Sequence, residues 1–321
     1  MDLGKIRDNF YEYGYTTSIL GFSEINFRHD NLRGKIILYQ SSEDTDLHYK
    51  SYIEDVLLGL HLSGAILIPR FSYFRAHHNK VFMEILRDIS TNDSIRNIAS
   101  RSFGTYEEFE RTNQIIDLPA VLKASSGARS ANVSVHDNYI ALQQAIWTVS
   151  LSASWYHGLK RRMANKVGKI LGIDRGLKMS RNRKKFILQQ FVPNLSHDFK
   201  ILIYGTKYYV MQRRVRPNDF RASGSGLWAW PRDIPPEMLN YAESVIAGFD
   251  VPFISLDVAF DDKQFYLFEF QFLMFGNVAM ENSSHYFVKR ENQWALVEEK
   301  SSLEREFVTS IVEYINRHYP E

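Results

Sequence analysis

The chain has 321 residues, of which 45% are hydrophobic and 24% are charged, a balance typical of a globular protein with two or three subdomains. A net charge of +2 indicates no general affinity for polyanions, and we expect no nucleic-acid partner. The absence of cysteine excludes disulfides, thiolate catalysis and cysteine metal ligands, and makes a reducing cytoplasm the simplest setting.

No apolar run reaches the roughly 18–20 residues that a membrane helix needs, and the first residues lack the apolar core of a signal peptide. Residues 1–33 show no clear periodicity. Apolar strands are expected over 35–40 and 64–69, with helical spacing of apolar residues over 48–62 between them. This order predicts a βαβ unit. A further helix is expected over 80–89.

The middle of the chain combines short apolar segments with a loop of small residues. Residues 118–123 and 131–135 read as strands, and the small residues 124–130 between them read as a flexible loop. Residues 138–170 are expected to be mostly helical, with Trp147 and Trp155 packing. Another strand is predicted over 186–192.

The last third begins with two strands, 198–204 and 207–214. The turn Gly205-Thr206 between them has glycine in its first central position, which favours a tight hairpin. Helices are expected over 235–248 and 303–318. The mixture of elements predicts an α/β or α+β fold.

Two carboxylates and an amide are the most informative residues of the chain. Apolar runs flank the turn at 261–264, so the segment reads as a hairpin that brings Asp257 roughly opposite Glu269. Because side chains alternate along a strand, Glu269 and Gln271 share a face while Phe268 and Phe270 take the other. Oxygen ligands of this kind suit a hard divalent ion such as Mg²⁺.

Lys123 ends an apolar strand and precedes a loop that contains Ser125, Ser126 and Gly127. Backbone N–H groups of such a loop can surround phosphate oxygens, and the ammonium adds a positive charge. The alternative is an ordinary hairpin with a solvated lysine. The segment is not a Walker motif.

Arg213 and Arg221 flank a short loop that a glycine-rich segment, 223–226, follows. Guanidinium groups bind carboxylates and phosphates bidentately, so these residues suggest an anion site. An exposed basic loop is the alternative. The stretch 160–185 is rich in lysine and arginine, and it either binds a phosphorylated substrate or forms a solvated helix and loop.

The ten histidines show no zinc spacing. His77 and His78 are adjacent, and we interpret them as loop residues that do not easily converge on one ion. The lack of a G-x-S-x-G segment argues against an α/β-hydrolase.

The order of these motifs, over about 80–282, resembles the ATP-grasp superfamily of ATP-dependent carboxylate–amine ligases, which includes ribosomal-protein glutamate ligases and D-alanine–D-alanine ligases. The resemblance implies an ATP-grasp fold with an N-terminal Rossmann-like pre-ATP-grasp domain. It divides the chain into 1–100, a lid subdomain over 101–192 and a C-terminal core over 193–321.

Roles follow from the resemblance position by position. Lys80 and Lys123 would contact nucleotide phosphates, with the loop of Ser125, Ser126 and Gly127 covering them. The hinge strand would read adenine, Asp198 and Lys200 would line the nucleotide site, and one or two Mg²⁺ ions would sit at the acidic hairpin. The implied hinge residues are Gln189, Gln190, Phe191 and Val192, the implied catalytic residues Arg213 and Arg221, and the implied metal ligands Asp257, Glu269 and Gln271.

Two departures from the family pattern matter. Gln271 replaces the usual asparagine, and Gln189-Gln190 replaces the acidic residue that is common at the hinge. The resemblance implies an ATP- and Mg²⁺-dependent ligase that joins a small-molecule carboxylate to an amine through an acyl-phosphate. A non-catalytic nucleotide-binding module and a sugar-nucleotide-dependent transferase are the alternatives.

The sequence leaves several substrate classes open. A sugar acid, an amino acid and a peptide all fit, and modification of a cell-surface polysaccharide is one guess. Segments that suit an acceptor pocket are 75–78, 160–185 and Trp228-Ala-Trp230, whose two indoles would share a face in an extended segment and either stack on a sugar ring or pack into the core.

Overall fold

The computed structural model describes residues 1–112, 116–126, 132–152, 180–217 and 219–320. The chain forms two compact units. The first comprises Met1–His78, Leu86–Ile98 and Val192–Glu321, and the second comprises Asn79–Ile85 and Ala99–Phe191. Both contain helices and sheet, which confirms the predicted mixed fold. The division at residues 100 and 192 stays a prediction.

The first unit begins with the predicted βαβ arrangement. Strands β1 (Ile36–Leu38) and β2 (Ile66–Ile68) pair in parallel, and helix α2 (His48–Leu62) connects them. The apolar face of α2 packs on β2 and on Phe74 of helix α3 (Phe71–Ala76). A two-stranded sheet confirms the βαβ unit, while a full Rossmann-like domain stays a prediction.

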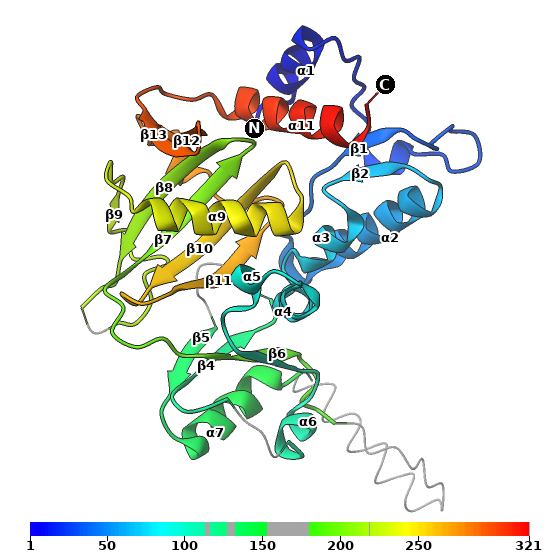
Figure 1. The fold of residues 1–321 in the computed structure, drawn as a ribbon. Helices are drawn as coiled ribbons and strands as arrows, with labels where there is room; N and C mark the ends of the chain where they lie inside the picture. Colours follow the sequence, from blue (N-terminus) through cyan, green and yellow to red (C-terminus); the bar gives the residue numbers. More distant parts are fainter. Residues whose placement is uncertain (113–115, 127–131, 153–179, 218, 321) are drawn as a thin grey trace, which may run out of the picture. The chain divides into compact units, whose positions relative to one another are not determined.

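A larger antiparallel sheet makes up most of the first unit (Figure 1). Its strands follow the order β11-β10-β7-β8-β12-β13, and β9 pairs with β8 beside this path. The bounds are β7 His197–Tyr204, β8 Lys207–Arg214, β9 Trp228–Ala229, β10 Phe253–Phe260, β11 Phe265–Gln271, β12 Tyr286–Arg290 and β13 Gln293–Val297.

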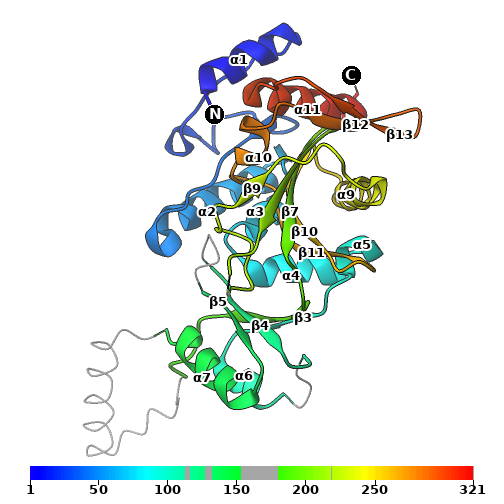
Figure 2. The same ribbon diagram turned by 90° about the vertical axis from the view of Figure 1, so that its left-hand side faces the viewer.

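Helices cover both faces of this sheet. Figure 2 shows α9 (Pro236–Phe249) on one side and α10 (Val278–Glu281) on the other. Because side chains alternate, Leu202, Tyr204 and Met211 share one face, where they pack with α10 and with α11 (Leu303–His318). The opposite face packs against α9, where Phe249 contacts Phe270 with ring centroids 4.5 Å apart.

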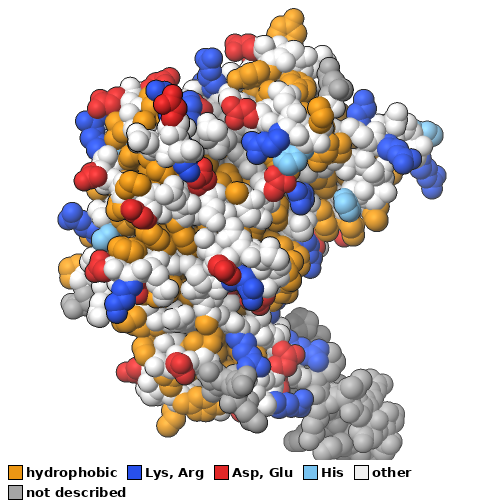
Figure 3. Space-filling view, viewed as in Figure 1, with side chains coloured by type: hydrophobic (Ala, Val, Ile, Leu, Met, Phe, Trp, Pro, Cys, Tyr) orange, Lys and Arg blue, Asp and Glu red, His pale blue; other side chains and the backbone are white. Residues whose placement is uncertain are grey.

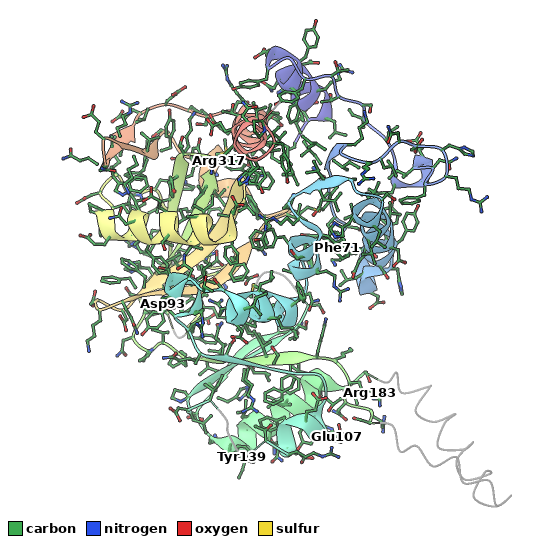
Figure 4. The ribbon with its side chains drawn as sticks, turned by 45° about the vertical axis from the view of Figure 1, so that its right-hand side comes forward. Phe71, Asp93, Glu107, Tyr139, Arg183 and Arg317 are labelled. Atoms are coloured by element: carbon green, nitrogen blue, oxygen red, sulfur yellow. The ribbon has the colours of Figure 1, made fainter. Side chains whose placement is uncertain are left out.

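The second unit is built on a four-stranded antiparallel sheet in the order β3-β6-β4-β5. Helices α6 (Tyr106–Glu110) and α7 (Tyr139–Ser150) pack on one face of it, and Figure 4 labels Glu107 and Tyr139 on these helices. The strands are β3 Ser100–Phe103, β4 Ala120–Ala124, β5 Val133–His136 and β6 Phe186–Gln190. Helix α4 (Lys80–Ile89) contributes residues to both units, and the short α5 (Asp93–Arg96) belongs to the first.

Most predicted elements are present at or near their expected bounds, including the helix over 80–89 and the final helix. Helix α7 ends at Ser150, earlier than expected, and residues 153–179 with Trp155 lie outside the described residues. Trp147 contacts Tyr106 at one edge, with ring centroids 5.0 Å apart, but remains 50% exposed.

Several elements were missed. Helix α1 (Leu3–Glu12) begins after Asp2, whose carboxylate accepts hydrogen bonds from two backbone N–H groups. The hairpin of β12 and β13 turns at Glu291 and Asn292, both with positive φ, as a type I′ turn requires. Short 3₁₀ turns at Phe22–Glu24 and Thr45–Leu47 complete the described elements.

Within the described residues, no helix combines the length and apolar character needed to cross a membrane. On the face seen in Figure 3, basic and acidic side chains are interspersed among apolar ones. This mixed surface agrees with the small net charge.

Candidate functional site

The acidic hairpin forms as predicted. Strands β10 and β11 pair so that Asp257 lies opposite Glu269 and Ser255 lies opposite Gln271. The register shifts between Asp257 and Val258, which leaves Phe268 as the extra residue of a β-bulge beside Glu269. The turn is held by the Asp261 carboxylate, which accepts from the backbone N–H groups of Lys263 and Gln264 at 3.0 and 2.9 Å.

Charged residues of β7 and β8 continue the line of Asp257 and Glu269 across the sheet. We call this set of five side chains the polar row; its members are Asp198, Lys200, Arg213, Asp257 and Glu269. Lys200 lies opposite Asp257, and Asp198 lies opposite Arg213. Because Asp198 and Lys200 are two residues apart on one strand, all four side chains share a face with Glu269. The polar row lies on the same sheet face as Leu202 and Met211. The apolar core that packs against α10 and α11 therefore borders the row on this face.

The row contains a buried ion-pair network. Arg213 Nε and Nη2 donate to the two carboxylate oxygens of Asp198 at 2.6 and 2.8 Å. Arg213 Nη2 also lies 3.0 Å from one oxygen of Asp257, and Lys200 Nζ lies 3.4 Å from the other. Arg213 is only 5% exposed, so the alternative of an exposed basic loop is wrong for this residue.

Burial and ion pairing act in opposite directions on these groups. Burial raises the pKa of Asp257, but Arg213 and Lys200 outweigh that effect and hold it below the usual range. At Asp198, burial raises the pKa above the usual range although Arg213 opposes the shift. Burial lowers the pKa of Arg213, and the two carboxylates reverse that effect and raise it. The Asp257 carboxylate is therefore held ionised inside the protein.

The donor set at the hairpin fits a hard cation. Asp257 and Glu269 provide carboxylate oxygens and Gln271 provides an amide oxygen, which are ligands that Mg²⁺ accepts. The Gln271 amide donates from Nε2 to Glu269 Oε1 at 3.2 Å, so the two residues already hold each other's orientation. All three side chains are only partly buried, so a ligand can reach them.

Arg221 lies outside this network in the loop after β8. Its guanidinium donates to both carboxylate oxygens of Asp219 at 3.0 Å, and it is partly exposed. That partner lowers the pKa of Asp219 to about 2. The loop's Asn218 lies outside the described residues.

Lys123 belongs to the second unit and lies on β4. Its ammonium donates to Gln189 Oε1 on the neighbouring strand β6 at 2.6 Å, and Lys123 is only 9% exposed. A solvated lysine is therefore wrong for this position. Lys123 and Gln189 lie on the sheet face opposite the one that α7 covers, because their neighbours Leu122 and Leu188 point to α7.

The start of α4 adjoins this pair. Lys80 N–H donates to the Ser125 carbonyl at 2.8 Å, and Asn79 Oδ1 accepts from Lys185 Nζ at 2.7 Å. The structure thus brings the lysine-led helix, the end of β4 and the start of β6 together within one unit. Ser126 is exposed, and Gly127 lies outside the described residues.

The predicted hinge contains a boundary between the two units. Gln190 N–H donates to the Ala99 carbonyl at 2.8 Å, and the Gln190 side chain accepts from Ala99 N–H at 3.3 Å. Phe191 ends the second unit and Val192 resumes the first, where it is buried with Ile98.

The remaining residues that the sequence suggested for an acceptor pocket differ in their surroundings. Trp230 packs against the core and donates to the Ala279 carbonyl at 2.9 Å, so it is a packing residue, whereas Trp228 is 44% exposed. Most of the basic stretch, 160–179, lies outside the described residues. Lys185, the last residue of the basic stretch, directly precedes the buried strand β6, and Asn79 was given no role of its own from the sequence.

No protein-family model matches the chain, and no curated protein matches it. A search of solved structures finds a RimK domain protein ATP-grasp from Sphaerobacter thermophilus at 14% identity, with a TM-score of 0.48, over 86% of this chain and 89% of that one. It also finds the ATP-grasp ligase PsnB complexed with a minimal precursor, at 10% identity, with a TM-score of 0.48, over 97% and 94% of the chains.

A macrocyclase, MdnC from Microcystis aeruginosa bound with its precursor peptide MdnA, is found at 9% identity, with a TM-score of 0.48, over 97% and 95% of the chains. Identities and TM-scores this low do not carry an activity from those proteins to this one.

Proposed function

We propose that the protein is an ATP- and Mg²⁺-dependent ligase that joins a carboxylate to an amine. The observation that carries the proposal is the polar row of the large sheet, where Asp257 and Glu269 face each other and Arg213 and Lys200 lie beside them. Two carboxylates and two cations on one rigid sheet face suit the binding of a metal–phosphate complex.

The chemistry requires activation of the carboxylate. Transfer of the γ-phosphoryl group of ATP to a carboxylate oxygen gives an acyl-phosphate and ADP. The amine nitrogen then attacks the acyl carbon, an amide bond forms, and inorganic phosphate leaves. Such a reaction needs reactants held in line and negative charge screened, and it needs no protein nucleophile. The absence of cysteine is compatible with that requirement.

Asp257, Glu269 and Gln271 would hold Mg²⁺, which supplies positive charge to the β- and γ-phosphate oxygens when bound. Arg213 keeps Asp257 ionised and fixed through the contact at 3.0 Å. Its Nε and Nη2 are engaged by carboxylates. We therefore assign Arg213 both to the alignment of the metal ligand and to charge stabilisation. Arg221, which is more exposed, is assigned to contacts with the acyl-phosphate.

The second unit would supply the remaining phosphate contacts. Lys80 and Lys123 are proposed to neutralise the α- and β-phosphates, and Ser125 and Ser126 to begin the loop that covers them. The bond from Lys123 to Gln189 holds the ammonium at the strand end in a fixed position. Proposed adenine contacts fall on the backbone from Gln190 to Val192.

The test is a phosphate-release assay with ATP, Mg²⁺ and pooled carboxylates and amines that include sugar acids, amino acids and peptides. We expect release that depends on one carboxylate and one amine together, and mass spectrometry of the active pool should show a product lighter by one water than the two substrates combined. The absence of release from every pool would contradict ligase activity.

The Glu269→Ala variant should lose this release while keeping its fold by circular dichroism, because it removes a carboxylate oxygen from the metal site. Glu243→Ala is the matched control, since Glu243 lies on α9 and pairs with Lys289. Normal release by Glu269→Ala would refute the metal assignment.

A non-catalytic nucleotide-binding module is the second candidate. The bond from Gln271 to Glu269 favours it, because it uses an oxygen that a metal would need. Calorimetry with Mg-ATP separates the two functions. Binding of Mg-ATP without ADP formation in any substrate pool would support the module.

A further inference from the structure

A second cluster of metal-ligating side chains lies apart from the polar row. Glu43, His77 and His78 each offer one ligand atom, and these three atoms lie within 4.8 Å of one another. All three residues belong to the first unit. The two adjacent imidazoles therefore lie closer to a common point than their spacing in the sequence predicts.

The backbone explains why the two rings meet. His77 follows the last residue of α3 in an extended conformation, and His78 then has a positive φ of 52°. In a regular strand the two side chains would point to opposite sides, but the left-handed residue reverses that alternation. The ring centroids lie 4.4 Å apart at an interplanar angle of 86°.

Both sides of the cluster are anchored by helix ends. His77 N–H donates to the Phe74 carbonyl at 3.0 Å, at the end of the helix on which Figure 4 labels Phe71. The loop that carries Glu43 is held to the start of α2, because the Asp44 carboxylate accepts from the backbone N–H groups of Tyr49 and Lys50 at 3.0 and 3.2 Å. Ligands on anchored backbone lose little entropy when they bind an ion.

A buried, unsatisfied nitrogen is the second observation. His77 is only 8% exposed, and its Nε2 has no hydrogen-bond partner among the described residues. Buried polar atoms rarely lack a partner, and each one calls for an explanation such as an ion or a water. A metal ion bound to the imidazole would satisfy it.

We propose that Glu43, His77 and His78 bind a divalent transition-metal ion, with Zn²⁺ as the preferred class. Two imidazoles and one carboxylate are a ligand set that Zn²⁺ accepts with a fourth position left for water or another ligand. His78 Nε2 and Glu43 Oε1 are 3.2 Å apart, close to the roughly 3.3 Å that separates two ligands on a tetrahedral Zn²⁺.

The third ligand needs only a small adjustment. No two of the three ligand atoms are more than 4.8 Å apart, so the widest pair exceeds tetrahedral spacing by at most about 1.5 Å. The Glu43 side chain is 47% exposed, so it can rotate toward the buried imidazole without disturbing the core.

The surrounding charges are compatible with a cation. The Lys50 ammonium, the lysine charge that acts on His77, lies 3.9 Å from the Glu54 carboxylate, which offsets it. Arg75 also pairs with Glu54. An ion at this site would tie the loop before α2 to the end of α3, and it would do so independently of the proposed ligase chemistry.

The experiment uses the full chain without a polyhistidine tag, after treatment with a chelator. Co²⁺ is added in the presence of excess Mg²⁺, and the visible absorption is recorded. We expect the intense bands of tetrahedral Co²⁺ at one equivalent, displaced by Zn²⁺. The absence of such bands, or a weak octahedral spectrum only, would overturn the proposal.

Variants locate the ion. His78→Ala should weaken Zn²⁺ binding by about 100-fold or more and abolish the tetrahedral bands, and Glu43→Gln should weaken binding by about tenfold. His29→Ala is the matched control, since His29 is an exposed histidine of the same unit. Glu269→Ala should leave the bands unchanged, which separates this site from the polar row.

Circular dichroism confirms that each variant is folded. If His78→Ala does not fold, the Glu43→Gln variant, which changes an exposed side chain, tests the assignment of the metal site. Tetrahedral bands of unchanged strength and affinity in Glu43→Gln would overturn the assignment, and their weakening would support it.

Discussion

The two units hold their buried cations by different means. On the large sheet, Arg213 and Lys200 contact the carboxylates of Asp198 and Asp257. In the smaller unit, Lys123 donates to the amide oxygen of Gln189. A carboxylate partner neutralises a charge, whereas an amide satisfies the hydrogen bond without itself contributing negative charge.

The largest effect is expected from Arg213→Ala. This change leaves Asp198 and Asp257 in the sheet without their shared partner, and breaking a buried ion pair in this way costs about 3–5 kcal/mol of stability. Urea unfolding followed by circular dichroism measures the loss. Arg214→Ala, at the exposed neighbouring residue, should change stability by less than about 0.5 kcal/mol. Equal stability of Arg213→Ala and the native protein would show that the network contributes little.

A smaller effect, on binding rather than folding, is expected from Lys123→Ala. Loss of one charged hydrogen-bond donor to phosphate should cost about 1.5–3 kcal/mol, or roughly tenfold to 100-fold in the Kd for Mg-ATP. Calorimetry provides the measurement, and Lys184→Ala, at an exposed lysine of the same unit, is the control. Unchanged affinity would remove Lys123 from the nucleotide site.

Gln189→Glu tests the comparison directly, because it replaces the amide that the Lys123 ammonium contacts with a carboxylate. The new carboxylate would compete with phosphate for the ammonium, so we expect Mg-ATP binding to weaken by about tenfold while the fold persists. Gln189→Leu removes the hydrogen bond without adding charge, and it distinguishes loss of positioning from loss of positive charge. Tighter Mg-ATP binding by Gln189→Glu would contradict the interpretation.

The smallest effect is expected from Asp198→Asn and depends on pH. Because burial raises the pKa of Asp198 in the folded protein, the native state retains a proton that the unfolded chain has released. The contribution of Asp198 to the free energy of unfolding therefore falls as pH rises through this window, by at most about 1.4 kcal/mol per pH unit. Urea unfolding across the acidic range should show this slope in the native protein and in the exposed control Asp233→Asn, and a reduced slope in Asp198→Asn. Identical slopes in all three proteins would show that Asp198 does not titrate in this way.

Local patterns in the sequence predicted the acidic hairpin well. The short turn at Asp261 predicts that Asp257 lies roughly opposite Glu269, as observed, although the register at the turn continued without a bulge would pair Asp257 with Phe268. The β-bulge at Phe268 was not predicted, because nothing in the local apolar pattern marks the extra residue. The hairpin β12–β13 could have been found from Glu291-Asn292, since asparagine tolerates the positive φ that the turn needs.

The sequence by itself determined the type and order of the main strands and helices and the pairing across short turns, because these depend on neighbours within a few residues. Only the tertiary structure decided that Lys123 meets Gln189, 66 residues away, and that Arg213 is buried between two carboxylates. It also brought Glu43 beside His77 and His78, against the expectation from their spacing. Contacts of this kind depend on how distant segments pack, and no periodicity along the chain records that packing.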